Sequence, residues 1–253
     1  MATASTTITI TGRITTTMDN ELKSLEPLAF LRQQSWLSPA FPTGSYSYSH
    51  GIEWAVESGY IQDRKSLVDW LEADLRYGSG RNESIFFMEA WRSAVNDDCR
   101  RLLKVSELAA AFRGTSEFAL ETSQQAKACL ATLTRVWPDP LIEGLSVCLS
   151  DLRIAPVLSV ILGIGMARQC ISAAFALPAF LQSYLANLVT AGVRLVPLGQ
   201  TDGQLAIAEL EAAVLAVASQ AEKATIEDLG SAAYMVDLAS ALHETQYTRL
   251  FRS

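Results

Sequence analysis

The chain has 253 residues, of which 49% are hydrophobic and 19% are charged, a balance typical of a folded globular protein rather than a disordered one. A chain of this length buries about three quarters of the surface that its unfolded form exposes. The formal net charge of −7 argues against a general nucleic-acid-binding protein, which normally carries a basic face.

The N-terminal segment differs in composition from the rest of the chain. Its first 17 residues, MATASTTITITGRITTT, include eight threonines and no apolar run of the kind found in a secretory signal. Helical patterning starts only a few residues later. We therefore expect residues 1–20 to form a disordered, threonine-rich tail and residues 21–253 to form the folded domain.

The first clear amphipathic helix lies around residues 66–76. Leu67, Leu71 and Leu75 recur with helical spacing, and charged residues lie between them. Ser66 and Asp69, three residues apart, resemble a capping box. The pattern predicts a helix that begins at Ser66.

The middle of the chain is its most apolar part. Residues 157–165 are hydrophobic all round, which predicts a central helix. GIGMAR at 163–168 begins like a dinucleotide-binding loop but lacks the last glycine and follows no strand, so we interpret its glycines as a close contact between helices. Residues 169–193 carry no formal charge and are long enough to cross a bilayer. Because polar residues interrupt them and no aromatic belt or basic flank frames them, we expect a buried helix pair and no membrane association.

Two more helices are predicted toward the C-terminus. Thr201 and Gln204 fit a capping box in front of an alanine-rich helix. Thr225 and Asp228 have the same spacing, so the last helix is predicted to begin near Thr225 and to continue to Tyr247 and beyond.

Prolines and glycines divide the chain into short helices. The predicted breaks are Pro39, Pro42, 78–80, Gly114, 137–140, Pro156, Pro178 and 196–203. Strand-like alternation occurs only in the N-terminal tail and briefly in SYSYS at 45–49. The predicted fold is therefore all-α, with about nine or ten helices in a single domain.

The cysteines and histidines give no sign of a metal centre. Cys99, Cys129, Cys148 and Cys170 form no close pair, which favours buried thiols in a reducing compartment over disulfides or a zinc site. With two histidines in the chain, a transition-metal site would need ligands from distant segments. We expect the protein to have no metal or cofactor of its own.

FPTGSYSYSHGIEWAVESG at 41–59 places serines and tyrosines beside His50. A serine-hydrolase elbow needs glycines on both sides of the nucleophile, and Gly44 and Gly51 are misplaced for it. His50 and Glu53, at a helix start, favour a hydrogen-bonded histidine over a metal ligand. Because the sequence also lacks a phosphate-binding G-x-x-x-x-G-K-[ST] loop, we expect a protein that is not an enzyme.

The C-terminal sequence HETQYTRLFRS, at 243–253, is rich in aromatic residues and arginine, which dominate the energetics of protein interfaces. Chain ends fray unless they are held, so this apolar end is expected to dock. Composition does not decide between docking on its own core and docking on a partner.

Three stretches resemble the signatures of the UreF family of urease accessory proteins. They are WLSPAFPTGSYSYSHGIEWAVESGYIQD (36–63), RLVPLGQTDGQ (194–204) and DLASALHETQYTRLFRS (237–253). They occur in the family's order, and the resemblance covers about residues 25–253, although the threonine-rich tail has no recognisable counterpart.

The resemblance implies a cytoplasmic, all-helical, dimeric scaffold for nickel insertion into urease. Such a protein joins the UreD (also called UreH) accessory protein and recruits the UreG GTPase, and the complex delivers Ni²⁺ to apo-urease. Ni²⁺ and GTP are then carried by the GTPase.

The resemblance also implies two sets of partner-binding residues. The first set is Tyr46, Tyr48, His50, Gly51 and Glu53. The second set is Tyr247, Arg249, Phe251 and Arg252.

Two alternatives remain open. A regulator of the GTPase would supply Arg249, Arg252 or Gln246 to the partner's phosphate site, as an arginine finger does. A nickel carrier would use His50 and His243.

Overall fold

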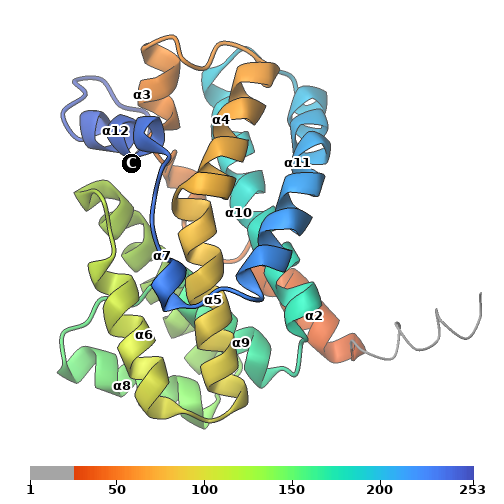
Figure 1. The fold of residues 1–253 in the computed structure, drawn as a ribbon, viewed down its shortest axis with the longest axis vertical. Helices are drawn as coiled ribbons and strands as arrows, with labels where there is room; N and C mark the ends of the chain where they lie inside the picture. Colours follow the sequence, from red (N-terminus) through yellow and green to blue (C-terminus); the bar gives the residue numbers. More distant parts are fainter. Residues whose placement is uncertain (1–25) are drawn as a thin grey trace, which may run out of the picture.

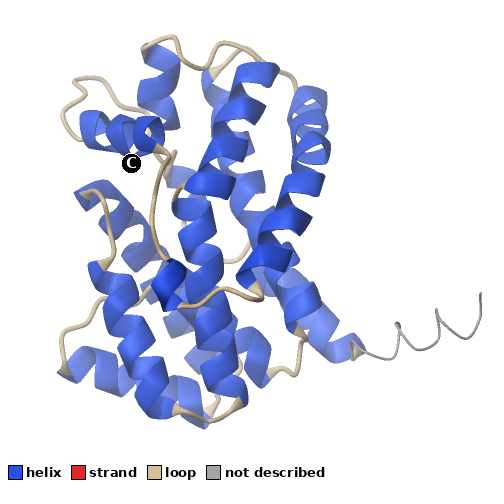
Figure 2. Ribbon diagram, in the orientation of Figure 1, coloured by secondary structure: helices blue, strands red, loops and turns tan. Residues whose placement is uncertain are grey.

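The computed structural model of the protein describes residues 26–253, and the expected tail at 1–20 lies outside this range. Within it the chain forms eleven α-helices, two single 3₁₀ turns and no strand (Figure 2). The all-α prediction is confirmed, with one helix more than the expected nine or ten. In chain order the elements are α2 (Pro27–Leu37), η1 (Ser45–Ser47), α3 (Ile52–Glu57), α4 (Arg64–Tyr77), α5 (Ser79–Val95), α6 (Cys99–Ala111), α7 (Ser116–Val136), α8 (Pro140–Asp151), α9 (Leu158–Arg168), α10 (Ala173–Leu195), α11 (Gln200–Ala221), η2 (Ile226–Asp228) and α12 (Tyr234–His243).

Helices α5 and α9 pack against each other at the centre of the fold (Figure 1). Every residue from Ser159 to Ala167 in α9 is buried, as its all-round hydrophobic sequence predicts. A Cβ atom at Gly163 would lie 2.5 Å from the carbonyl oxygen of Phe87 in α5, so only glycine allows this approach. The interpretation of GIGMAR as a close helix contact is confirmed.

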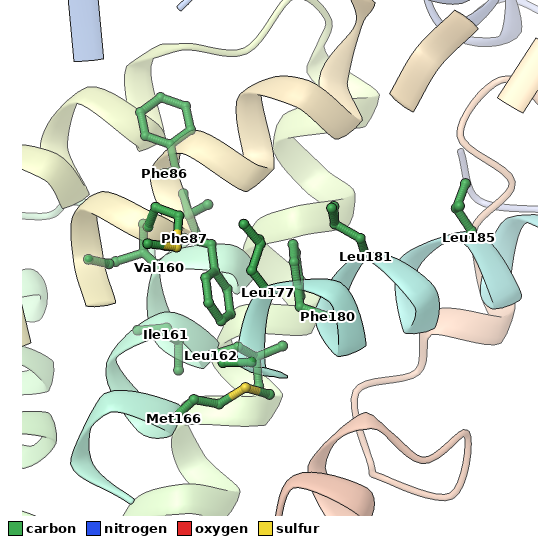
Figure 3. Packing of buried hydrophobic residues seen from close by; sticks show 14 of the residues in the cluster. Phe86, Phe87, Val160, Ile161, Leu162, Met166, Leu177, Phe180, Leu181 and Leu185 are labelled. Carbon is green, nitrogen blue, oxygen red and sulfur yellow. The ribbon is translucent and has the colours of Figure 1, made fainter. Parts of the chain in front are cut away.

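Helix α10 closes the core over this pair, as Figure 3 shows. The ring of Phe180 stacks on that of Phe87, with centroids 5.0 Å apart. Leu177 of α10 and Ile161 and Met166 of α9 belong to the same buried cluster. Large apolar side chains from three helices thus fill one continuous core.

Helices α10 and α11 are long and apolar enough to cross a membrane by length and composition alone. In the fold they pack against each other and against α4 and α5. A helix pair was predicted for residues 169–193, but α10 is one continuous helix that tolerates Pro178, which lacks one backbone donor.

Two helices begin before their predicted caps. Asp63 is the N-cap of α4: its carboxylate accepts the Ser66 N–H at 2.8 Å, and its own N–H donates to the Ser66 hydroxyl at 3.1 Å. Helix α11 begins after Gly199, whose N–H donates to Asp202 at 3.1 Å. Both regions offer more than one polar pair at capping distance, and spacing alone does not choose between them.

The last helix, in contrast, starts later than predicted. Thr225 and Asp228 do form a capping box, but the element that it caps is the short 3₁₀ turn η2 and not the last helix. The chain then runs without regular structure to α12, because the N–H of Gly230 bonds to Asn82 (3.1 Å) and that of Ala232 to the carbonyl of Tyr77 (2.7 Å). These contacts deliver α12 to a site beside α3 and α7.

The predicted burial of the four cysteines is right for one residue only. All four thiols are free, and burial raises the pKa of Cys129 to about 12. Cys99, Cys148 and Cys170 are exposed. Two of them lie where regular structure begins or ends: Cys99 starts α6 and Cys170 follows α9.

Candidate functional site

Residues 44–51 form two turns that lead into α3. Gly44, with φ of 72°, opens the 3₁₀ turn η1, where the sequence had suggested strand-like alternation. His50 (φ 57°) and Gly51 (φ 78°) are both left-handed, a conformation that non-glycine residues adopt rarely. A Cβ at Gly51 would lie 2.8 Å from the backbone nitrogen of Ser240, so glycine lets α12 pack here. The paired turns direct the His50 side chain into the protein.

The C-terminal segment, residues 247–253, docks on these turns. The Arg252 N–H donates to the carbonyl of Ser47 at 2.8 Å, and the Ser49 N–H donates to the backbone oxygen of Ser253 at 2.5 Å. The Ser49 hydroxyl donates to the same oxygen at 2.6 Å. In this chain by itself the segment therefore packs on its own core.

Glu53, in the first turn of α3, holds the segment through its backbone. Its two carboxylate oxygens accept the N–H groups of Leu250 (2.5 Å) and Phe251 (2.8 Å). Glu53 is buried. Hydrogen bonds from backbone donors to a buried carboxylate are among the stronger ones in proteins.

His243, at the end of α12, lies between two carboxylates. Its Nε2 is 3.1 Å from Glu53, and its Nδ1 is 2.8 Å from Glu117 of α7. Arg249 adds an ion pair with Glu117 at 3.0 Å. Three helices and the C-terminal segment thus meet at one fully buried imidazole.

His50 forms a second centre. Its Nδ1 is 3.1 Å from Glu121, which also accepts the Ser253 hydroxyl at 3.0 Å. Its Nε2 is 2.6 Å from the Ser79 hydroxyl and 3.2 Å from that of Tyr184. The imidazole also stacks on a ring of α7, that of Phe118, at 3.9 Å between centroids.

Ser79, His50 and Glu121 are connected in the order of a nucleophile, a base and an orienting acid. The Ser79 hydroxyl, however, donates to Asp74 at 2.7 Å, and Tyr184 donates to the same carboxylate at 2.7 Å. A hydroxyl whose only hydrogen points to a carboxylate leaves none for the histidine to accept. The cluster is arranged to hold segments together and lacks a primed nucleophile.

Among residues 26–253, no three histidine, cysteine or acidic side chains are grouped to hold a metal ion. Both ring nitrogens of His50 and of His243 already face protein groups. The arrangement therefore gives the nickel-carrier alternative no support.

Two cation–π contacts join the segment to the rest of the chain. The guanidinium of Arg194 lies 4.4 Å from the ring centroid of Phe251 and donates to the carbonyl of Tyr46 at 2.8 Å. Arg252 lies 5.8 Å from the ring centroid of Tyr48. Such cation–π contacts contribute about 0.5–2 kcal/mol each.

A cavity of about 540 Å³ adjoins the His50 centre. Glu83 and Arg113 line it and form an ion pair with each other. The Nη2 atom of Arg113 and the hydroxyl of Ser159, both buried, have no hydrogen-bond partner among the described residues. The cavity is large enough to hold several waters.

Burial and charge shift three pKa values in the cluster. Desolvation lowers the pKa of His50, but the carboxylates of Glu121, Asp74 and Glu83 outweigh it, so the net shift is upward. Burial raises the pKa of Glu117 despite His243 and Arg249. The pKa of Tyr184 is raised well above its ordinary value, first by burial and then by Asp74, which keeps its hydroxyl protonated.

The structure brings both predicted sets of site residues together in one region. Tyr48, His50, Gly51, Glu53 and Phe251 are buried, and Tyr46, Tyr247, Arg249 and Arg252 are exposed. Their contact with a partner stays a prediction, but only the exposed group presents side chains at the surface of the isolated chain.

Sequence reasoning found Glu53 but missed the other carboxylates of the cluster, Asp74, Glu117 and Glu121. Glu117 and Glu121 lie one turn apart on α7, which Thr115 caps, so both face α12 and the C-terminal segment. Asp74 ends α4 among charged neighbours and gave no distinct signal. The i, i+4 spacing of the two glutamates was the one available clue.

Comparison with known proteins identifies the family. The model of the UreF family matches residues 61–211. The urease accessory protein UreF of Rhodopseudomonas palustris strain BisB5 is 44% identical over 238 residues, covering 94% of this chain and 97% of that protein. The protein of the same name from Bradyrhizobium diazoefficiens is 44% identical over 233 residues, covering 92% and 95%. The chain therefore belongs to the UreF family of urease accessory proteins.

Proposed function

We propose that this chain is a non-enzymatic scaffold for urease maturation. It joins the UreD (UreH) accessory protein and recruits the UreG GTPase, so that Ni²⁺ reaches apo-urease through the complex. Nickel and GTP belong to the GTPase, and the scaffold works in the cytoplasm as a homodimer. Membership of a family of accessory proteins supports the maturation role.

The observation that carries the proposal is an apolar surface formed by α12 and the C-terminal segment. Six large side chains on it are exposed: Tyr234, Met235, Leu238 and Leu242 of α12, and Tyr247 and Leu250 of the segment. Exposed apolar side chains that gather on neighbouring elements favour protein association. We call these six residues the α12 patch.

The buried residues give this patch its shape. Glu53 accepts the N–H groups of Leu250 and Phe251, which lie on either side of the Leu250 Cα atom, and the Leu250 side chain faces outward. Phe251 is buried as an anchor. In the proposed scaffold the predicted buried residues position the segment, and the exposed Tyr46, Tyr247 and Arg252 contact the partner.

Light scattering coupled to size-exclusion chromatography tests the proposal, with the chain alone and mixed with cognate UreD and UreG. We expect a dimer that forms a larger complex with UreD and then accepts UreG. The double variant Tyr247→Ala/Leu250→Ala should lose the complex. Leu215→Ala on α11 is the matched control, since Leu215 and Leu250 are both 61% exposed. A wild-type chain that ignores both partners would overturn the scaffold, and a double variant that binds normally would overturn the patch.

A second candidate is regulation of the GTPase by Arg252. This side chain is exposed and forms no ion pair among residues 26–253, whereas Arg249 is held by Glu117. An arginine free of a carboxylate can reach a partner's phosphate. Arg252→Ala should then bind UreG normally but fail to change its rate of GTP hydrolysis. A variant and a wild type with equal hydrolysis rates would refute this role.

A further inference from the structure

Arg194 of α10 joins two segments of the candidate site, although it was not among the predicted site residues. Its guanidinium donates to the carbonyl of Tyr46 at 2.8 Å and lies 4.4 Å from the ring centroid of Phe251. Arg194 is exposed, whereas Phe251 is buried. A guanidinium has five N–H groups, and this hydrogen bond uses one of them, so most of its donors stay available.

Arg252 lies at the same junction. Its backbone N–H donates to the carbonyl of Ser47 at 2.8 Å, and its guanidinium lies 5.8 Å from the ring centroid of Tyr48. The contacts of Arg194 and those of Arg252 are therefore one residue apart on each of two chain segments. Because consecutive Cα atoms are about 3.8 Å apart, a few residues of a partner can contact both side chains. We call Arg194 and Arg252 the arginine pair.

The arginine pair has no carboxylate partner among residues 26–253. The ion pairs that arginines form there include neither Arg194 nor Arg252. Glu121 acts on the pKa of Tyr48 as Arg252 does, but it is buried, faces His50 and accepts the hydroxyl of the last residue. A carboxylate is a strong partner for an arginine, because the planar guanidinium binds it through two parallel N–H···O bonds.

Both guanidiniums are restrained within the isolated chain. The rings of Tyr48 and Phe251 and the carbonyl of Tyr46 already limit their freedom. Less conformational entropy is then lost when a partner binds. The side chain of Tyr46, beside the pair, is 71% exposed. Tyrosine and arginine are the residue types that are enriched among the strongest contacts of protein interfaces.

The charge of the whole chain limits what the arginine pair can bind. The formal net charge is −7, which repels long polyanions such as nucleic acids and anionic membrane surfaces. At physiological salt, charges further away than about 8 Å are largely screened. A short acidic segment that lies on the two guanidiniums is therefore attracted by them and is little affected by the distant acidic residues.

We propose that the arginine pair binds an acidic segment of the partner protein that covers the α12 patch, with a carboxylate of that segment on the two guanidiniums. Residues 247–253 connect the two surfaces, because Tyr247 and Leu250 belong to the α12 patch and Arg252 belongs to the pair. This inference rests on the proposed function, in which that partner is UreD, and it adds the chemistry by which the partner is recognised.

Association with UreD, followed by stopped-flow fluorescence over a series of NaCl concentrations, tests the proposal. The wild-type rate should fall as NaCl rises, because salt screens the attraction. Arg194→Glu and Arg252→Glu should each slow association by about tenfold at low salt and flatten its salt dependence. Arg100→Glu on α6 is the matched control, since Arg100 is also exposed and the change of charge is the same. It should change the rate much less.

Two measurements separate recognition from support of the segment. Hydrogen exchange of residues 247–253 should show wild-type protection in Arg252→Glu, because the backbone N–H of Arg252 makes the hydrogen bond to Ser47. Arg194→Lys keeps the charge but lacks the planar fork, so it should preserve the association rate and speed dissociation. Protection that is lost in step with binding would show that the pair only holds the segment, and it would refute the proposal.

The remaining outcomes are distinct. Replacing the exposed acidic residues of UreD by arginine, one at a time, should restore the rate of Arg194→Glu at one position, and a scan without any rescue would overturn the acidic segment. Wild-type rates and salt dependence in both Arg194→Glu and Arg252→Glu would overturn the inference and leave the scaffold standing. Unchanged association with UreD, together with altered GTP hydrolysis by UreG, would assign the arginines to a phosphate and refute it too. A wild-type chain that never binds UreD would overturn the proposed function and, with it, this inference.

Discussion

The sharpest test of the site's architecture is the replacement of Glu53 by alanine. This one carboxylate accepts the backbone N–H groups of Leu250 and Phe251 and faces Nε2 of His243. It is therefore the point at which α3, α12 and the C-terminal segment are joined. The substitution leaves two backbone donors and one imidazole without their acceptor.

The cost follows from what is left unpaired. Removing one partner of a buried ion pair destabilises a protein by about 3–5 kcal/mol. Part of this cost is relieved when residues 247–253 detach and their N–H groups bind water, so we expect about 3 kcal/mol. For a domain of this size that corresponds to a fall in Tm of roughly 6–12 °C. Glu53→Gln keeps one acceptor oxygen and should cost about 1–3 kcal/mol.

Urea denaturation followed by circular dichroism measures this free energy, and Glu57→Ala is the matched control. Glu57 lies one turn further along α3, is exposed, and bonds only to the side chain of Gln246. It should cost no more than about 0.5 kcal/mol. Equal free energies of unfolding for the two variants would refute the role assigned to Glu53.

Three further predictions follow from the same contacts. Deleting residues 247–253 should lower the free energy of unfolding by about 2–4 kcal/mol, measured by urea denaturation, because it uncovers the carboxylates that the segment caps; an unchanged midpoint would show that the segment is not anchored. Gly163→Ala should lower the free energy of unfolding by about 1–3 kcal/mol, because its Cβ would meet Phe87. The control Gly144→Ala has open space around it and should be neutral or slightly stabilising. Equal Tm values for the two variants would contradict the close contact. The raised pKa of His50 predicts that stability is highest below about pH 6.5 and falls as the pH rises through the folded value, and His50→Gln should flatten that fall in a series of melts across pH.

Residues in the core were predictable because burial leaves a local mark. Helix α9 is hydrophobic on every side, and this alone identified it as central. The two glycines in GIGMAR were correctly interpreted because a dinucleotide loop needs a strand before it, and none was present.

The polar cluster was not predictable in the same way. His50 and Glu121 are 71 residues apart, and His243 and Glu53 are 190 apart. No periodic pattern relates positions so far apart, and a buried glutamate looks like a surface glutamate in a single sequence. The start of the last helix was misplaced for a related reason. Asp228 does form a capping box with Thr225, but the distant Asn82 binds the backbone of Gly230, and the helix begins only at Tyr234.

The docking of the C-terminal segment shows which information composition lacks. Aromatic and arginine residues in 247–253 predicted attachment but fitted a partner and the chain's own core equally well. The decision lies with Glu53, which binds backbone groups and is therefore indifferent to the side chains of the segment. The side chains of the segment differ in burial: that of Phe251 is buried in the protein, while those of Leu250 and Tyr247 are exposed.

The segment is held through its backbone, whereas most of its side chains point outward, and this explains why serines, tyrosines and a histidine are concentrated in residues 44–50. A scaffold that presents an apolar patch must hold that patch rigidly without burying it. Polar groups do this well, because hydrogen bonds to Ser47, Ser49 and Glu53 fix the segment's backbone while its outward side chains stay available. The same chemistry makes the attachment depend on charge, because the carboxylates of Glu53 and Glu117 hold the segment through backbone N–H groups and through Arg249.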